Sequence, residues 1–205
     1  MLLRNEPVQA RSTARLASLL DAAASVVDEI GYERLTTALV AERAGASIGT
    51  VYRYFPDRIA VLQGLSARFL GVSLDTIRAT LIDEANDSWA KAFRSVIDDL
   101  VESFRTVPGF RSLRFGDVLD LRPTTLADSG VCTVAKVIAS ALSDRFGLDA
   151  GETLEFRITV TLDLADALLN RAFETDADGD QRYIDEAHTL VRNYLTGFYS
   201  NENAT

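Results

Sequence analysis

Few side chains in this 205-residue sequence are of the types that carry out catalysis or bind metals. Its one histidine, His188, lies beside an apolar stripe and has no second His or Cys with which to share a metal. Its one cysteine, Cys132, lies in an apolar segment, where a small core side chain is expected rather than a redox sensor. Residues 176–180 resemble a calcium loop, but glycine occupies its fourth position instead of its sixth, and Ala187 stands where glutamate is needed. We therefore predict no metal, no cofactor and no enzymatic activity.

The composition is that of a globular chain with its own core. Apolar residues make up 47% of the sequence and charged residues 25%. The longest uncharged stretches, such as residues 59–67, have about half the length that a membrane-spanning helix needs, and the N-terminus has no apolar signal segment. We expect a cytoplasmic protein with no membrane partner.

The acidic residues are concentrated after residue 58. The chain carries 21 basic and 30 acidic residues, and the resulting net charge of −9 argues, taken alone, against a nucleic-acid partner. Residues 1–58 contain seven arginines and seven acidic residues, so the whole negative excess belongs to residues 59–205. The acidic residues of the first part cluster from Asp21 to Glu42; Arg4, Arg11 and Arg15 precede this cluster, and Arg53 and Arg58 follow it. A locally basic face is therefore compatible with the sequence.

Apolar residues recur at three- and four-residue steps through nearly the whole chain, which predicts an all-α protein with about nine helices. The first helix is expected at about residues 12–30, ended by Gly31, and two short helices follow at 37–44 and 47–55, with Thr36 and Ser47 as caps. Helices of two turns are unstable alone, so they must pack on the first helix as a trihelical unit. Later helices are expected at about 58–70 or on to 81, from beyond residue 88 to 106, and at 110–121, 124–146, 150–174 and 180–200.

A dense motif runs from Gly31 to Phe55. Its segments are GYERLTT at residues 31–37, VA at 40–41 and AGASIGTVYRYF at 44–55. This motif resembles the DNA-binding signature of TetR-type transcriptional regulators. The resemblance is close over residues 12–70, whereas the later helices agree with the family only in number and order. Ala46 replaces the commoner valine and Ile59 stands where an acidic residue is frequent, and neither change removes a DNA contact.

The resemblance implies a helix-turn-helix in which residues 37–44 form the first helix and residues 47–54 the recognition helix. Such a helix places its N-terminal turns in the major groove, so Gly49 suits a close approach of its backbone to DNA, and Ser47 serves as both cap and phosphate contact. Hydroxyl and guanidinium groups are expected to contact further phosphates. These groups belong to Thr37, Tyr52 and Arg58, the last at a position where the family usually has lysine.

Base readout is expected from Ile48, Gly49, Thr50 and Arg53. Arg53 can make a bidentate contact with guanine, and Ile48 can pack on a thymine methyl group. A second interpretation of Ile48 stays open, because its spacing to Val51 and Phe55 also suits the core. For Tyr54 a partial packing role is favoured beside a DNA contact.

A helix-turn-helix built of two-turn helices makes few base contacts, so DNA specificity generally needs two copies on half-sites about one helical turn apart. We therefore expect a homodimer on double-stranded DNA. The family uses its last two helices for the dimer interface, and the alternative is that their apolar stripes pack only within their own chain. The stripe residues proposed for the interface are Ile158, Leu162, Ala165, Leu169, Ile184, Val191, Leu195 and Phe198.

The helices between residues 65 and 175 are expected to enclose an apolar cavity for a small-molecule effector. Most aromatic side chains there belong to ordinary core, and nothing in the sequence identifies the effector. The candidate lining residues are Phe69, Trp89, Phe93, Phe104, Phe115, Cys132 and Phe156.

The predicted architecture is a helix-turn-helix domain at residues 1–57 joined to a ligand-binding and dimerisation domain at residues 58–205. The predicted function is a ligand-responsive transcriptional regulator, a repressor released from a palindromic operator by a small molecule, with an activator as a lesser variant. The alternative is a helical small-molecule-binding or scaffold protein whose helix-turn-helix no longer binds DNA. A neutral or negative recognition face would favour that alternative.

Overall fold

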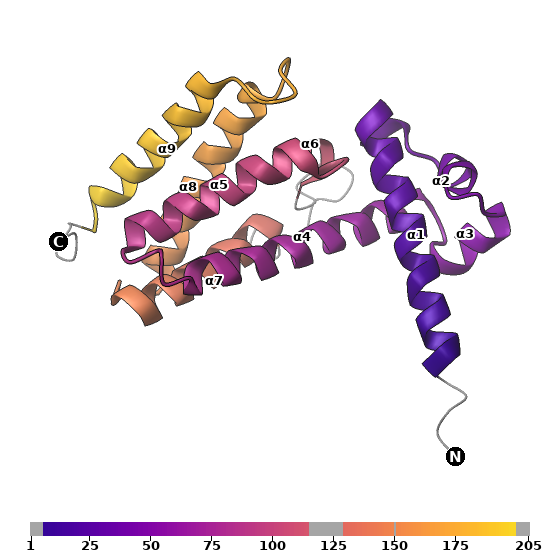
Figure 1. The fold of residues 1–205 in the computed structure, drawn as a ribbon, viewed down its shortest axis with the longest axis horizontal. Helices are drawn as coiled ribbons and strands as arrows, with labels where there is room; N and C mark the ends of the chain where they lie inside the picture. Colours follow the sequence, from indigo (N-terminus) through magenta and orange to yellow (C-terminus); the bar gives the residue numbers. More distant parts are fainter. Residues whose placement is uncertain (1–5, 115–128, 150, 200–205) are drawn as a thin grey trace. The chain divides into compact units, whose positions relative to one another are not determined.

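The computed structural model describes residues 6–114, 129–149 and 151–199. Within these ranges every regular element is helical, which confirms the predicted all-α class (Figure 1). The elements are α1 (Glu6–Ile30), the 3₁₀ helix η1 (Tyr32–Arg34), α2 (Thr37–Arg43), α3 (Ile48–Tyr54), α4 (Arg58–Ile82), α5 (Trp89–Thr106), α6 (Phe110–Leu113), α7 (Gly130–Phe146), α8 (Glu152–Ala172) and α9 (Gln181–Thr196).

Several helix boundaries differ from those expected. Helix α1 begins at Glu6 instead of residue 12, because Pro7 is tolerated in the first turn of a helix, where its missing N–H is not needed. Helix α7 begins at Gly130, where the Ser129 Oγ accepts from the Cys132 backbone N–H at 3.1 Å and caps the helix, and residues 124–128 of the expected helix lie outside the described ranges. The helix expected at 110–121 is described only as the short α6, and residues 115–121 lie outside the described ranges.

The chain divides into two compact units. The first comprises residues 1–69 with 108–122, and the second comprises residues 70–107 with 123–205. The predicted division after residue 57 differs from this one, because residues 58–69 of α4 cluster with the first unit.

In the first unit, α1 provides the surface on which the short helices pack. Leu19, Ala23 and Val27 on α1 are fully buried, and Val40 of α2 and Val51 of α3 are equally inaccessible. Two-turn helices are held in this way by tertiary packing rather than by their own stability. The unit therefore fixes α2 and α3 against a helix of 25 residues.

In the second unit, α8 and α9 pack along each other, α7 packs on α8, and α5 contacts both α8 and α9. Phe93, Ile97 and Phe104 of α5 are almost completely buried. The ring of Phe104 stacks at 5.2 Å on that of Phe173, which follows α8. No helix in the described ranges combines the length and apolar content needed to cross a membrane.

Candidate functional site

The turn between α2 and α3 is closed by backbone hydrogen bonds around Gly45. The Gly45 N–H donates to the Glu42 carbonyl at 3.1 Å, and the Ala46 N–H donates to the Ala41 carbonyl at 2.9 Å. This pair of bonds is the Schellman arrangement, which needs a left-handed residue after the helix, and Gly45 has φ +56. The local sequence therefore sets the angle at which the chain enters α3.

Ser47 begins α3 as its N-cap. Its Oγ accepts from the Thr50 backbone N–H at 3.1 Å and lies 2.9 Å from the Thr50 hydroxyl oxygen. The cap satisfies one of the N–H groups that the first turn leaves without an intrahelical partner. Both predicted contact residues, Ser47 and Thr50, thus stand together at the start of this helix.

Helix α3 has one buried face and one open face. Val51 is fully buried and Phe55, just after the helix, is 5% exposed, whereas Ile48 is 43% and Tyr52 53% exposed. The interpretation that placed Ile48 in the core is therefore wrong: its spacing matches that of Phe55, but at the first turn of the helix its side chain is left largely open. Ile48 and Tyr52 are available to an external partner.

Gly49 has no internal packing reason to be glycine. A Cβ atom added there would meet only the Ser47 Oγ, at 3.9 Å. Glycine inside a helix lowers stability by about 0.5–1 kcal/mol relative to alanine. Glycine at this exposed position therefore lowers the stability of α3 without serving the packing of the protein.

Two hydroxyl contacts hold the tyrosines of α3. The Thr37 hydroxyl on α2 donates to the Tyr52 phenol oxygen at 3.4 Å. The Tyr54 phenol oxygen lies 3.3 Å from the Ser12 hydroxyl oxygen on α1, and its side chain is half-buried. Tyr52 is thus presented outward beside Thr37, whereas Tyr54 packs partly on α1.

The two arginines proposed for DNA contact differ in their surroundings. Arg53 is exposed, is the one charged residue of α3, and makes no hydrogen bond or ion pair within the described part of the chain. The Arg58 guanidinium Nη2 instead donates to the Tyr32 carbonyl at 2.9 Å, at a partly buried site. Arg58 therefore has a structural bond to η1 that sequence spacing did not indicate.

Sequence reasoning also missed the ion pair that anchors α2. The Arg43 guanidinium donates to both carboxylate oxygens of Glu29 on α1, at 2.7 and 2.6 Å, and also contacts Ser25. These hydrogen bonds lower the pKa of the exposed Glu29 carboxyl below its ordinary value. A charged residue in the last turn of α2 was the available signal, but its partner lies 14 residues earlier in the sequence.

The electrostatic character of α3 follows from its neighbours. Glu29 neutralises Arg43, but α3 itself contains Arg53 and no acidic residue, so Arg53 gives the open face of α3 one positive charge. Anionic backbones of nucleic acids are attracted by such a face.

A cavity of about 400 Å³ lies in the second unit between α5 and α9. Among the residues that line it, Trp89 and Phe93 were proposed from the sequence. The lining residues are Trp89, Ala90, Lys91, Phe93, Arg94, Asp185, His188, Thr189, Val191, Arg192 and Leu195.

The other proposed cavity residues lie elsewhere. Phe69 and Phe104 are buried in aromatic contacts, with Phe69 edge-on to Phe110 at 5.6 Å. Cys132 is half-buried on α7. Phe156 is 65% exposed, so the proposal that it lines a cavity is wrong, because α8 turns it to the surface. Phe115 lies outside the described residues.

Most of the proposed dimer residues belong to the core of their own chain. Ile158, Leu162, Ala165, Leu169, Ile184, Val191 and Leu195 are at most 5% exposed. They cannot present a surface to a second chain, so these seven assignments are corrected, whereas Phe198 is 47% exposed.

The apolar residues that α8 and α9 do expose form a different set. Phe156 is joined by Leu164 on α8 and Leu190 on α9, each 38% exposed, and by Phe198 just beyond α9. The Phe198 ring lies under the Arg157 guanidinium at 3.8 Å. We call Phe156, Leu164, Leu190 and Phe198 the exposed apolar face.

Two family models match this chain. Residues 19–65 match the model of bacterial regulatory proteins of the tetR family, and residues 87–199 match the model of the tetracycline repressor-like C-terminal domain. A crystal structure of a TetR-family transcriptional regulator from Streptomyces coelicolor is 32% identical, with a TM-score of 0.76, over 89% of this chain and 98% of that one.

Two curated relatives match over shorter stretches. The nucleoid occlusion factor SlmA of Alteromonas mediterranea is 31% identical over 53% of this chain and 55% of its own. The HTH-type transcriptional repressor KstR of Mycolicibacterium smegmatis is 38% identical over 33% of each chain. The matched segment thus spans between a third and about half of the length of these relatives.

Proposed function

The chain belongs to the tetR family of bacterial regulatory proteins, and from that premise we propose that it is a DNA-binding transcriptional repressor whose hold on an operator is controlled by a small molecule. The observation that carries the DNA contact is the open face of α3, which combines a glycine without an internal packing role, an exposed Ile48 and an arginine that forms no ion pair with the described residues. The likeness to the repressor KstR supports the same assignment.

In this proposal the N-terminal turn of α3 enters the major groove. The absence of a side chain at Gly49 lets the backbone approach the bases, with Ile48 against a thymine methyl group and Arg53 bidentate to guanine. Tyr52 and Thr37 present neighbouring hydroxyls to phosphate, and the cap at Ser47 does the same at the helix N-terminus.

Arg58 has a more limited part in phosphate binding than its charge alone indicates. One of its guanidinium nitrogens is bonded to the Tyr32 carbonyl, so the residue also holds the segment between α1 and α2. Replacing it would disturb both the fold of the first unit and any phosphate contact. Arg53 is therefore the better residue with which to test base readout, because its replacement should not disturb the fold.

The repressor acts as a homodimer in this proposal, because a recognition helix of seven residues makes too few base contacts alone. The exposed apolar face supports a second copy as the occupant, since α8 and α9 pack along each other and both helices, or the residues just after them, expose large apolar side chains. Binding to chromosomal DNA would place the protein in the cytoplasm.

The positive charge of α3 argues against the alternative, a scaffold protein whose helix-turn-helix no longer binds DNA. The experiment that separates the two functions is selection of bound duplexes from random-sequence DNA. We expect an enriched palindrome with two half-sites, and Arg53→Ala should relax the preference at one guanine position in each half-site. Selection without any enriched sequence would contradict the proposed function.

A further inference from the structure

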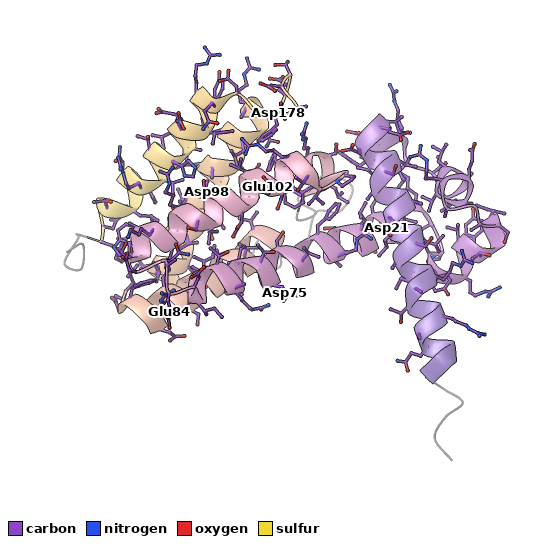
Figure 2. The ribbon with its side chains drawn as sticks, viewed as in Figure 1. Asp21, Asp75, Glu84, Asp98, Glu102 and Asp178 are labelled. Carbon is purple, nitrogen blue, oxygen red and sulfur yellow. The ribbon has the colours of Figure 1, made fainter. Side chains whose placement is uncertain are left out.

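The cavity between α5 and α9 contains a buried histidine with one unsatisfied nitrogen. The His188 side chain is 8% exposed, and its Nε2 lies 2.9 Å from the Oδ1 of Asp98 on α5. Figure 2 labels Asp98 on α5, the helix that faces α9 across this cavity. The Nδ1 of the same ring is buried and has no hydrogen-bond partner in the described part of the chain.

The hydrogen bond to Asp98 determines which nitrogen of the His188 ring carries the proton and which can accept a hydrogen bond. A carboxylate only accepts, so Nε2 must carry the proton that joins the two groups. Burial lowers the pKa of His188 below its ordinary value, with the Asp98 carboxylate opposing that effect. The ring is therefore neutral at pH 7, and its Nδ1 presents a lone pair that accepts a hydrogen bond. A buried acceptor without a donor is costly, so a ligand donor that reached this atom on binding would be stabilised there.

The charged residues that line the cavity are mostly cations. Lys91, Arg94 and Arg192 face it together with one carboxylate, that of Asp185. This excess is unusual in a chain with a net charge of −9.

Two of these cations have carboxylate neighbours outside the cavity lining. The Lys91 ammonium lies 2.8 Å from Asp87 and the Arg94 guanidinium 3.9 Å from Asp98, with all four side chains more than half exposed. Ion pairs exposed to water in this way contribute little and exchange partners readily. The cations are therefore available to an anionic group at the cavity rim.

The floor of the cavity is apolar. Trp89, Phe93, Val191 and Leu195 line it and are each at most 6% exposed. A hydrocarbon body in the cavity would contact the small apolar area that these side chains still expose. The volume of about 400 Å³ lies within the range of small-molecule sites.

We propose that this cavity binds an organic monocarboxylate with an apolar body and a hydroxyl or N–H group, the carboxylate meeting Lys91 and Arg192 and the donor meeting the His188 Nδ1. The inference deepens the proposed function by naming the chemical class of its effector, and it rests on that function only for its regulatory consequence. Binding itself is measured without DNA, so failure to bind the acid and failure to bind an operator are separate results.

Trp89 provides a direct measurement, because it lines the cavity and is the single tryptophan of the chain. The full-length protein is titrated with 3-hydroxyoctanoate while the tryptophan emission is recorded, and octanoate and octane-1,3-diol are titrated in parallel. We expect a saturable emission change with the hydroxy acid, and affinity weaker by about tenfold for octanoate, which leaves the buried Nδ1 unsatisfied. The diol lacks the anion and should bind at least tenfold more weakly than the hydroxy acid.

Two sets of variants test the named side chains. His188→Leu removes the acceptor and should abolish the preference for 3-hydroxyoctanoate over octanoate while octanoate still binds. The chain has two lysines, so Lys91→Gln can be compared with Lys136→Gln on the exposed surface of α7. Lys91→Gln should weaken binding of the hydroxy acid several-fold, and Lys136→Gln should leave it unchanged.

Circular dichroism shows which variants retain the helical fold, and conclusions are drawn from those. The proposal is overturned if wild-type protein shows no saturable emission change with either acid. It is equally overturned if the diol binds as well as the hydroxy acid, or if the two lysine variants weaken binding alike.

Discussion

The Thr37 hydroxyl at the start of α2 donates a hydrogen bond of 3.4 Å to the phenol oxygen of Tyr52 on α3, so the two helices of the helix-turn-helix present adjacent hydroxyls on one surface. This contact is long and exposed, and it contributes little to folding. Its value in our proposal lies in holding the Tyr52 phenol where it can reach a phosphate.

Tyr52→Phe should therefore leave the denaturant midpoint nearly unchanged and weaken DNA binding several-fold, to a similar extent on specific and random duplexes. A DNA titration paired with denaturant unfolding measures both effects. Tyr54→Phe serves for comparison, because the half-buried Tyr54 phenol is hydrogen-bonded to Ser12 on α1. We expect a smaller change in DNA affinity for this variant. An equal loss of affinity in both variants would contradict the distinction between the two tyrosines.

The ion pair between Arg43 and Glu29 predicts an acid-dependent part of the stability of the first unit. Hydrogen bonds from Arg43 hold the pKa of Glu29 below its ordinary value, so the stabilisation is complete above the unfolded-state pKa of about 4.3 and is lost as the pH falls through the folded-state value. Glu29→Gln should unfold at lower temperature than wild type at pH 7, and the difference should vanish in acid.

Melting curves of wild type and Glu29→Gln from pH 7 to pH 3 test whether the difference in melting temperature shrinks as the pH falls. Glu84→Gln, which removes an exposed carboxylate with no ion pair in the described ranges, controls for the loss of one charge. A constant difference between wild type and Glu29→Gln down to the lowest pH would show that the stabilisation does not depend on ionisation of Glu29.

Gly109 packs α6 against α1 at close range. It has φ +76, its N–H donates to the Asp28 carboxylate at 2.9 Å, and a Cβ atom there would lie 2.9 Å from the Ala24 carbonyl oxygen. Gly147 has a similar φ of +70 but no atom within 4 Å of the same added carbon.

Gly147→Ala should therefore lower the free energy of unfolding by about 1–2 kcal/mol, from backbone strain alone. Gly109→Ala adds a clash with backbone and should cost clearly more. Denaturant unfolding of the two variants measures the difference. Equal destabilisation would mean that α6 shifts away from α1 without loss, contrary to the close packing described.

The exposed apolar face predicts the oligomeric state. Phe156→Glu combined with Leu164→Glu should convert a dimer into monomers, because two charges would be buried without partners against the second copy. Ile82→Glu is the matched control, since Ile82 is an apolar residue 75% exposed elsewhere in the second unit. Sedimentation velocity gives the mass directly. A dimer that survives the double substitution would place the interface on another surface.

The sequence predicted the recognition helix well because its signals are local. The caps at Thr36 and Ser47 and the left-handed turn at Gly45 involve partners within a few residues, and the structure contains each of them. Arg58 and Arg43 were harder to interpret, because their partners Tyr32 and Glu29 are distant in sequence and become neighbours only after the helices pack.

Apolar periodicity identified the buried faces of α8 and α9 but not what covers them. Ile158 and Leu162 satisfy the helical pattern and are buried by their own chain. Phe156 and Leu164 lie outside that stripe, eight residues apart, and their exposure depends on which helices surround α8. A sequence pattern alone does not distinguish an intramolecular neighbour from a second copy.

The central claim is that the backbone of α3 at Gly49 meets DNA, and two glycines allow a matched test. Gly49 and Gly71 both lie in helices, and a Cβ added at either position meets nothing closer than 3.9 Å within the protein. Each Gly→Ala variant should therefore have a free energy of unfolding about 0.5–1 kcal/mol higher than wild type.

The decisive measurement is the affinity of wild type, Gly49→Ala and Gly71→Ala for the selected palindromic duplex, with unfolding recorded for each. We predict that Gly49→Ala loses at least about tenfold in affinity, or about 1.4 kcal/mol, despite being more stable, and that Gly71→Ala binds like wild type. A Gly49→Ala variant that binds the duplex as tightly as wild type would contradict the account.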